Sequence, residues 1–526
     1  MTTPLNSYVC GSWRAPEDEG TVLRDAATGE PIATISARPL EYGPIVSYAR
    51  EVGGPALREM TFKGRAALLK ALGKHLSARI PEFTELSLRT GATKRDAVVD
   101  IDGGVNALFV YGSKGAKELP DTNVVVDGEF EPLGKGGTFG VQHILTPRLG
   151  AAVQINAFNF PVWGMLEKLA PALLAGVPSI IKPASQTAYL TEMVFREIID
   201  SGILPEGSVQ LVCARPDGLI DQLGPQDSLA VTGSKDTATG LRRNDTIIGN
   251  AVRYTAEADS LNASVLGPDV TPEDPEFDVF VKMVTTEMTQ KAGQKCTAIR
   301  RVFVPAAQVD AVQEAIIARL RRVTVGNPAD EDTRMGALAS QTERDDVRES
   351  VEKLSNAAKI VFGDPHERPE NFSAAADFGA GAFMSPILLR ADDPNHDELH
   401  SIEAFGPVAT LMPYEGAEQV AALIARGEGS LVASVVTADA DFASSVVVAA
   451  GPWHGRILVL DRDSAGESTG HGAALAQALH GGPGRAGGGE ELGGLRAVPH
   501  HLQRTAIQGG PDLLASITNT KETEQQ

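Results

Sequence analysis

One stretch in the first half of the chain alternates strand-like apolar runs with amphipathic runs, and this alternation constrains the fold more than any other feature. The apolar runs VPSIIKPA, SVQLVC and SLAVTGS predict strands at 177–184, 208–213 and 228–234, and helical spacing of apolar residues predicts helices at 161–176 and 187–202. Strands that are joined through helices pair in parallel, because the helix returns the chain to the starting edge of the sheet. The sequence therefore predicts an α/β fold with a doubly wound parallel sheet.

The second half of the chain repeats this pattern, which indicates a second α/β unit. A helix is predicted at 277–293, a strand at 298–305 and an amphipathic helix at 306–323. The 526 residues are also too many for one simple hydrophobic core. We therefore expect two or three domains.

The charge balance excludes several classes of partner. The chain has 47 Lys and Arg against 68 Asp and Glu, a formal net charge of −21, which disfavours binding to nucleic acid and to anionic membranes.

No apolar run reaches the roughly 18 residues of a membrane span, and no signal-peptide pattern is evident. The three cysteines, Cys10, Cys213 and Cys296, stand far apart without a CxxC pair, which favours a reducing compartment. We expect a cytoplasmic protein.

Cys296 is the cysteine whose surroundings best suit a nucleophile. It lies in GQKCTA, after a predicted helix and before a predicted strand, where small neighbours leave the sulfur approachable. Backbone N–H groups in such a turn would favour the thiolate and hold an oxyanion. A buried structural cysteine is the alternative that the spacing alone leaves open.

Six short motifs, taken together, resemble the aldehyde dehydrogenase superfamily. They follow the order and separations of that family over roughly residues 5–510, and they are NAFNFPVWG (156–164), IIKPASQT (180–187), VTGS (231–234), EADSLNA (257–263), GQKCTA (293–298) and EAFGPV (403–408). The resemblance implies a Rossmann-like cofactor domain, a second α/β catalytic domain and a small β oligomerisation arm. It divides the chain into the cofactor domain at 1–123 and 151–257, the catalytic domain at 258–465, the arm at 124–150 and 498–512, and a disordered tail at 513–526.

The resemblance also implies a role for each of four residues. Cys296 matches the nucleophile, and Asn159 matches the amide that forms the oxyanion hole with the Cys296 backbone N–H. Glu257 matches the general base that activates water against the thioester, and Lys168 matches a position thought to relay protons. Partial burial that raises the pKa of Glu257 would suit this base. A surface carboxylate is the alternative for Glu257.

The cofactor is inferred from the position three residues after Lys182. In the family, the matching lysine binds the adenosine ribose, and a glutamate three residues later commonly holds the 2′-hydroxyl. Here that position is Ser185, which has no charge to repel a 2′-phosphate, so we expect NADP. A serine that merely caps the next helix is the alternative. The other expected cofactor-binding residues are Phe158, Thr232, Gly233, Ser234, Glu403 and Phe405.

The presence of Glu257 favours water over coenzyme A as the acyl acceptor, so the expected product is a free acid. Within the family, the chain is most similar to members from aerobic benzoyl-CoA and phenylacetyl-CoA breakdown, which act on ring-opened CoA thioesters with a terminal aldehyde. The resemblance implies a stand-alone enzyme for 3,4-dehydroadipyl-CoA semialdehyde, assembled as a homodimer or homotetramer. The alternatives are an NAD-linked or CoA-acylating aldehyde dehydrogenase of another substrate, and a non-catalytic protein that keeps the fold.

Three further features could be mistaken for functional sites: a metal-binding-like motif, a glycine-rich run and a pair of adjacent histidines. The stretch from His396 to His400, HDELH, resembles a zinc-protease motif with its glutamate one place late, so no metal site is predicted. The glycine-rich run at 481–494 resembles a phosphate loop but ends without Lys-Ser/Thr, so we expect a flexible loop near the active-site mouth. We expect His500 and His501 to be packing or interface residues.

Overall fold

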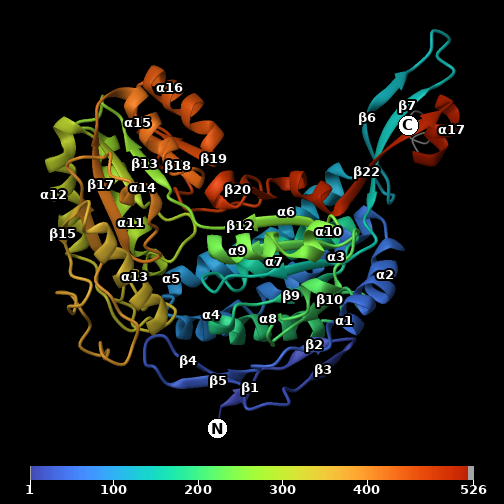
Figure 1. Ribbon diagram of the computed structural model, residues 1–526, viewed down its shortest axis with the longest axis horizontal. Coiled ribbons are helices and arrows are strands. Elements are labelled where there is room, and N and C mark those ends of the chain that lie inside the picture. Colours follow the sequence, from blue (N-terminus) through green and yellow to red (C-terminus); the bar gives the residue numbers. More distant parts are fainter. Residues whose placement is uncertain (1, 519–526) are drawn as a thin grey trace.

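The alternating segments of the first half form one of two seven-stranded sheets in the computed structural model, which describes residues 2–518 (Figure 1). Five strands are parallel and two antiparallel strands follow at one edge, in the order β12 (Arg253–Glu257), β11 (Ser228–Thr232), β8 (Ala152–Ile155), β9 (Ser179–Lys182), β10 (Val209–Leu211), β2 (Ser7–Val9) and β3 (Ser12–Arg14). The connecting helices are α7 (Trp163–Ala175), α8 (Ala188–Asp200), α9 (Lys235–Arg242) and α10 (Asp245–Gly249). The strand order reverses direction between β8 and β11, and a ligand site is expected beyond the carboxyl ends of the strands at such a point.

The second seven-stranded sheet comes entirely from the second half of the chain. Its order is β15 (Lys359–Phe362), β16 (Ile387–Arg390), β17 (Val408–Tyr414), β14 (Arg301–Pro305), β13 (Ala263–Leu266), β18 (Ser430–Val436) and β19 (His454–Leu460). Only β15 is antiparallel to its neighbour, and all seven residues of β18 are buried, as expected for a strand covered on both faces. The accompanying helices are α11 (Pro275–Thr289), α12 (Val309–Leu320), α13 (Gln341–Leu354), α14 (Glu398–Ser401), α15 (Gly416–Ala425) and α16 (Ala440–Ala450).

A helical layer packs on the first sheet and fixes the position of α7. It comprises α2 (Gly54–Arg58), α3 (Phe62–Ser77), α4 (Ile80–Ser87), α5 (Lys94–Ala97) and α6 (Gly103–Glu118), whereas α1 (Tyr42–Tyr48) packs in a separate core with α9 and α10. Helix α6 runs so close to α7 that a Cβ at Gly104 would lie 2.9 Å from the Cα of Trp163. Side chains on α7 therefore have little freedom to shift along the sheet.

A three-stranded antiparallel sheet extends away from the two larger sheets (Figure 1). Its order is β22 (Leu502–Gly509), β7 (Gly140–Pro147) and β6 (Val125–Pro132). The helix α17 (Pro511–Thr518) follows β22, so the prediction of a disordered tail is wrong for 513–518. The apolar Leu514 explains the difference, because it is buried and lies 3.1 Å from where a Cβ at Gly509 would be. The rest of that predicted tail, 519–526, lies outside the described residues.

The glycine-rich run near the C-terminus is a β-hairpin, not the flexible loop that its composition predicts. Strand β20 (Leu479–Gly482) pairs with β21 (Gly489–Leu492) around a short 3-10 turn. A second small sheet joins β1 (Thr3–Pro4), β5 (Pro31–Ile35) and β4 (Thr21–Arg24). Across residues 2–518, no helix has both the length and the apolar character that crossing a membrane requires.

Candidate active site

A cavity of about 530 Å³ lies where the carboxyl ends of the first sheet meet the amino ends of the second. The segments that follow β8, β11 and β12 line one side, and they include Asn159, Ser234 and Glu257. Cys296, which precedes β14, and Phe405, which precedes β17, line the other side. Residues predicted from separate motifs therefore border one space, at the point where the strand order reverses.

The backbone before Cys296 has an unusual conformation that the surrounding structure holds in place. Lys291, Ala292 and Gly293 have φ angles of 54°, 50° and 68°, and the first two lack the freedom of glycine. The Lys291 backbone N–H donates to Oδ1 of Asp96 at 2.9 Å, and its ammonium group donates to Thr90 at 2.8 Å. Helix α5, which contains Asp96, thus stabilises the turn that presents the cysteine.

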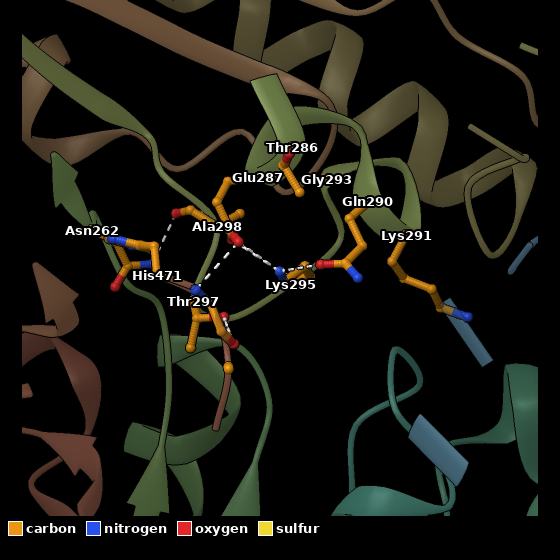
Figure 2. Close-up of polar contacts among 12 residues, drawn as sticks. Asn262, Thr286, Glu287, Gln290, Lys291, Gly293, Lys295, Thr297, Ala298 and His471 are labelled. Atoms are coloured by element: carbon orange, nitrogen blue, oxygen red, sulfur yellow. Dashed lines mark hydrogen bonds and ion pairs between the residues drawn. The ribbon is translucent and has the colours of Figure 1, made fainter. Parts of the chain in front are cut away.

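The residues on either side of Cys296 are also anchored. Figure 2 shows Lys295 between Glu287 and Gln290, with Nζ–O distances of 3.0 Å to Glu287 Oε1 and 2.7 Å to Gln290 Oε1. On the other side, the Thr297 hydroxyl donates to the carbonyl of Gly472 at 3.0 Å. The Asn262 amide donates to the Cys296 carbonyl at 2.7 Å. The Cys296 backbone N–H is therefore held in a fixed orientation, as an oxyanion donor must be.

The surroundings of Cys296 favour the thiol over the thiolate, whereas the sequence predicted backbone N–H groups that favour the thiolate. Burial and the neighbouring Glu257 carboxylate raise the pKa of Cys296 well above its usual value. The sulfur lies 4.0 Å from Nε2 of His480. Attack on a carbonyl therefore requires a nearby group that takes the thiol proton.

Glu257 ends β12 and is buried, so the alternative of a surface carboxylate is wrong. Burial works against its charge, but His480, Lys168 and a hydrogen bond with Cys296 outweigh it and lower the pKa of Glu257 to about 2. The expectation of a raised pKa is therefore also wrong. Its Oε2 lies 2.7 Å from Nε2 of His480, which places the carboxylate between an imidazole and a thiol.

The trio of Glu257, Cys296 and His480 offers three ligand types within 4.8 Å of one another. The 2.7 Å separation between Glu257 and His480 is a hydrogen-bonding distance, whereas two ligands of one tetrahedral zinc lie roughly 3.3 Å apart. The present geometry therefore fits a shared proton. In the HDELH segment, both ring nitrogens of His400 are used, by Arg301 at 3.0 Å and by the Pro394 carbonyl at 2.7 Å.

Asn159 lies in the same cavity, with its side-chain amide directed at the cysteine loop. Nδ2 donates to the carbonyl of Gln294 at 3.2 Å, and the residue is only 5% exposed. An amide has two N–H donors, so one bond to Gln294 orients the group and leaves a second donor. This arrangement suits a neutral group that stabilises negative charge near Cys296.

Lys168 lies on α7 between two carboxylates, at 2.6 Å from Glu167 and 2.9 Å from Glu491. Burial alone would lower the pKa of Lys168, but these groups and Glu257 raise it. Burial raises the pKa of Glu167 well above its usual value, which favours a protonated carboxyl group in this cluster. The cluster borders a small cavity of about 30 Å³ that His500 and His501 also line. Lys168 is therefore a fixed cation close to Glu257.

Most residues expected to bind the cofactor line the cavity with Cys296. Phe158 and Phe405 meet edge to face at 6.0 Å, and Thr232 and Gly233 precede α9. The cap of α9 is Ser234, whose hydroxyl accepts from the Thr237 N–H. Glu403 accepts from the Ser260 N–H at 2.9 Å, and burial raises the pKa of Glu403 to about 7.

Lys182 and Ser185 do not border that cavity. The Lys182 ammonium group is buried and donates to the carbonyl of Pro183 at 2.5 Å. Ser185 is exposed and lines an adjoining cavity of about 700 Å³, and Gln186 borders both spaces. Ser185 also does not cap a helix, because it is the first residue of a 3-10 turn whose N-cap is Ala184. Ser185 thus lies beside the main cavity, next to Gln186, which borders both spaces.

The sequence motifs miss His480, Glu167 and Glu491, which contact the expected catalytic groups. His480 and Glu491 are the titratable ends of HGGPGRAGGGEE, and Glu167 precedes Lys168. Two charged residues within an otherwise apolar helix, and a histidine beside a glycine run, were the available signals.

Comparison with known proteins agrees with this geometry. Residues 13–451 match the aldehyde dehydrogenase family. The chain is 41% identical over 484 residues to the 3,4-dehydroadipyl-CoA semialdehyde dehydrogenase of Aromatoleum evansii, which covers 91% of this chain and 93% of that protein. It is 49% identical over 186 residues to Protein MaoC of Klebsiella aerogenes, which covers 35% of this chain and 52% of that protein. The betaine aldehyde dehydrogenase of Staphylococcus aureus in complex with NAD+ superposes with a TM-score of 0.83 at 21% identity, over 96% of this chain and 94% of that one. The predicted fold is thereby confirmed, and the chain belongs to the aldehyde dehydrogenase family.

Proposed function

We propose that this enzyme uses NADP to oxidise the terminal aldehyde of an acyl-CoA semialdehyde, 3,4-dehydroadipyl-CoA semialdehyde, to the free acid. The observation that carries this proposal is the buried Glu257 carboxylate beside Cys296 in the main cavity. The relative of that name, 41% identical over most of both chains, supports the substrate. Three free cysteines support a cytoplasmic location.

The first half of the reaction uses Cys296 and Asn159. The thiol passes its proton to the neighbouring Glu257 carboxylate as the sulfur attacks the aldehyde carbon, and the carbonyl electron pair moves to oxygen. Glu257 then passes this proton to the cluster of Glu167, Lys168 and Glu491, so that it is free again as a base. Asn159 and the Cys296 backbone N–H hold the oxyanion. A bound nicotinamide would supply the hydride acceptor, which would leave a thioester on Cys296.

The second half uses Glu257. The carboxylate takes a proton from water as the water oxygen attacks the thioester carbon, and the carbon–sulfur bond then breaks. The acid leaves, and the neighbouring cluster of Glu167, Lys168 and Glu491 can receive the proton from Glu257. A carboxylate at this place is useful for water and unnecessary for a thiol acceptor, so hydrolysis is favoured over CoA acylation.

The residues present fit a dinucleotide. The N-terminus of α9 lies at the cavity wall, and backbone N–H groups at a helix start suit a pyrophosphate. The Thr232 hydroxyl oxygen there is buried without a hydrogen-bond partner among residues 2–518. Ser185 shares its cavity with Arg24, whose guanidinium suits a 2′-phosphate. These features support NADP.

Oligomerisation through the arm belongs to the same proposal. Both outer strands of the three-stranded sheet, β6 and β22, have an unpaired edge, and Phe139 beside β7 is 49% exposed. Native proteins usually cover such edges. We propose a homodimer or homotetramer in which a second copy does so.

The proposal is tested by incubating the enzyme with the semialdehyde and either NADP or NAD, with and without free coenzyme A. We expect the free acid as the product under all conditions, and a higher kcat/KM with NADP. A CoA thioester formed from the aldehyde carbon would establish the acylating alternative, and a preference for NAD would establish the NAD-linked one. No turnover with a panel of aldehydes would favour a non-catalytic protein.

A further inference from the structure

His480, which has no role in the proposed reaction so far, is brought to the nucleophile by the glycine-rich hairpin. In the hairpin, His480 pairs with Glu491 across the two strands. His480 contacts Glu257 and Cys296, whereas Glu491 contacts Lys168. One hairpin thus supplies two titratable side chains that contact Glu257, Cys296 and Lys168.

The hairpin is fixed against the strand that presents Glu257. A Cβ at Gly487 would lie 2.3 Å from the carbonyl oxygen of Ala256, and the Ala258 N–H donates to the Ala486 carbonyl at 3.0 Å. The hairpin therefore contacts the backbone on both sides of Glu257. The imidazole itself packs edge to face on Trp163 at 5.2 Å, in a side chain that is only 2% exposed. His480 has little room to turn away.

The hydrogen on His480 can be placed from these distances. A carboxylate oxygen and an unprotonated nitrogen at 2.7 Å would repel each other, so a proton on Nε2 is expected in this ion pair with Glu257. The same nitrogen is 4.0 Å from the sulfur, within reach of a small movement. One N–H therefore faces both the base and the nucleophile.

We propose that His480 is a catalytic residue. Its Nε2–H keeps its proton but changes its acceptor, from the Glu257 carboxylate to the Cys296 sulfur, as the thiol is deprotonated. This inference rests on the proposed role of Cys296 as the nucleophile. The S–H bond breaks and its electron pair stays on sulfur, while the proton forms an O–H bond with Glu257. Negative charge thereby passes from the carboxylate to the sulfur, and the imidazole N–H contacts whichever of the two groups is negative. The overall charge of the trio does not change.

The electrostatics of the site explain why such a donor is needed. Burial and the Glu257 charge raise the pKa of Cys296, so a thiolate there is costly without a compensating donor. The other charged groups that face Cys296 or Glu257 are Lys168, Glu167, Lys295, Arg300, Arg456 and Glu491. Of these, Lys168 and Lys295 are each paired with a carboxylate, and Arg300 faces Glu403. His480 is the donor that contacts both reacting groups.

The test measures alkylation of Cys296 by iodoacetamide between pH 5 and 10, with the Cys296 peptide quantified by mass spectrometry. This readout needs no aldehyde, cofactor or coenzyme A. We expect His480→Phe to slow alkylation at pH 7 by about tenfold or more and to raise the midpoint of the pH profile by about one unit or more. His480→Gln keeps an N–H donor on a differently shaped side chain, so its rate should lie between those of His480→Phe and the wild type. His454→Gln, at a buried histidine bonded to the Ala450 carbonyl, is the control and should match the wild type.

The inference is wrong if folded His480→Phe, with the circular dichroism of the wild type, is alkylated at the wild-type rate and midpoint. If His480→Phe does not fold, His480→Leu, which also lacks the N–H, decides, because a rate equal to that of His454→Gln would equally overturn the role. Failure of the proposed function gives a different result. In that case wild-type Cys296 would react no faster than the buried Cys213.

Discussion

The catalytic site has two walls that are built in different ways. The strand-end wall contains Asn159, Glu257 and Cys296, lines the main cavity and consists of segments at the ends of sheet strands. The hairpin wall is the glycine-rich hairpin, whose His480 and Glu491 contact Glu257, Cys296 and Lys168 without bordering that cavity. Strand ends are positioned by hydrogen-bonded pairing with neighbouring strands, whereas the hairpin is positioned by close backbone contacts that only glycine permits. The first wall should tolerate loss of a functional group without structural change, and the second should not tolerate an added methyl group.

The largest expected effect is on the strand-end wall, from Cys296→Ala. Without the nucleophile no thioester forms, so activity should fall by at least about 10⁴-fold, while NADP binding and thermal stability stay close to the wild type. Turnover and a fluorescence titration of NADP check these two parts. Cys213→Ala is the matched control and should keep its activity, because Cys213 is buried away from the cavity. Appreciable activity in Cys296→Ala would move the nucleophile elsewhere.

Glu257→Gln should have the next largest effect, on hydrolysis more than on thioester formation. Loss of the base should slow steady-state turnover by roughly 10²–10⁴-fold. Rapid mixing should reveal a burst of about one NADPH per site, because the thioester accumulates. Glu490→Gln, at an exposed glutamate on the hairpin, should retain normal turnover. A slowed burst followed by normal hydrolysis would contradict the assignment of the base.

The strand-end wall could largely be predicted from the sequence, and the hairpin could not. Continuous apolar runs such as SIIK predict buried parallel strands, and the structure has β9 at that place. Parallel strands direct their carboxyl ends to one edge, so residues that follow β8 and β12 are expected to lie together. The hairpin has few apolar residues, and its strands are held by glycine contacts that leave no periodic pattern.

The pKa shifts in the site could not be predicted from the sequence either, because they depend on contacts between residues that are far apart in the chain. Glu257 and His480 are 223 positions apart in the sequence, and their contact lowers the pKa of Glu257 where burial alone would raise it. The disordered tail was predicted from a polar composition, although Leu514 is apolar and is buried on the inner face of α17.

Gly487→Ala tests the hairpin wall directly. The new methyl group would lie 2.3 Å from the Ala256 carbonyl oxygen, so the hairpin must move away from Glu257. A displacement of about 1 Å in a catalytic group can cost on the order of 10²-fold in turnover. Gly488→Ala is a close control, because Gly488 also has a positive φ but its Cβ would meet nothing within 4 Å. Equal losses in both variants would show that backbone strain, and not this contact, controls the hairpin.

The smallest expected effect lies outside both walls, at Ser185. Ser185→Glu adds a negative charge where the 2′-phosphate of NADP is proposed to bind, and it offers NAD an acceptor for its ribose hydroxyl. Because Ser185 is exposed, water and salt screen the repulsion, and we expect a change of about tenfold in the NADP to NAD ratio of kcat/KM. Arg24→Ala should lower kcat/KM for NADP and leave the value for NAD unchanged. Thr342→Glu places the same charge on another part of that cavity and should change the ratio less.

Neither wall of the catalytic site is altered in these variants, so the burst of NADPH and the hydrolysis rate at saturating cofactor should stay at wild-type levels. If the ratio is the same in Ser185→Glu and Thr342→Glu, the 2′-phosphate does not lie beside Ser185, and the inference of NADP from that residue is wrong.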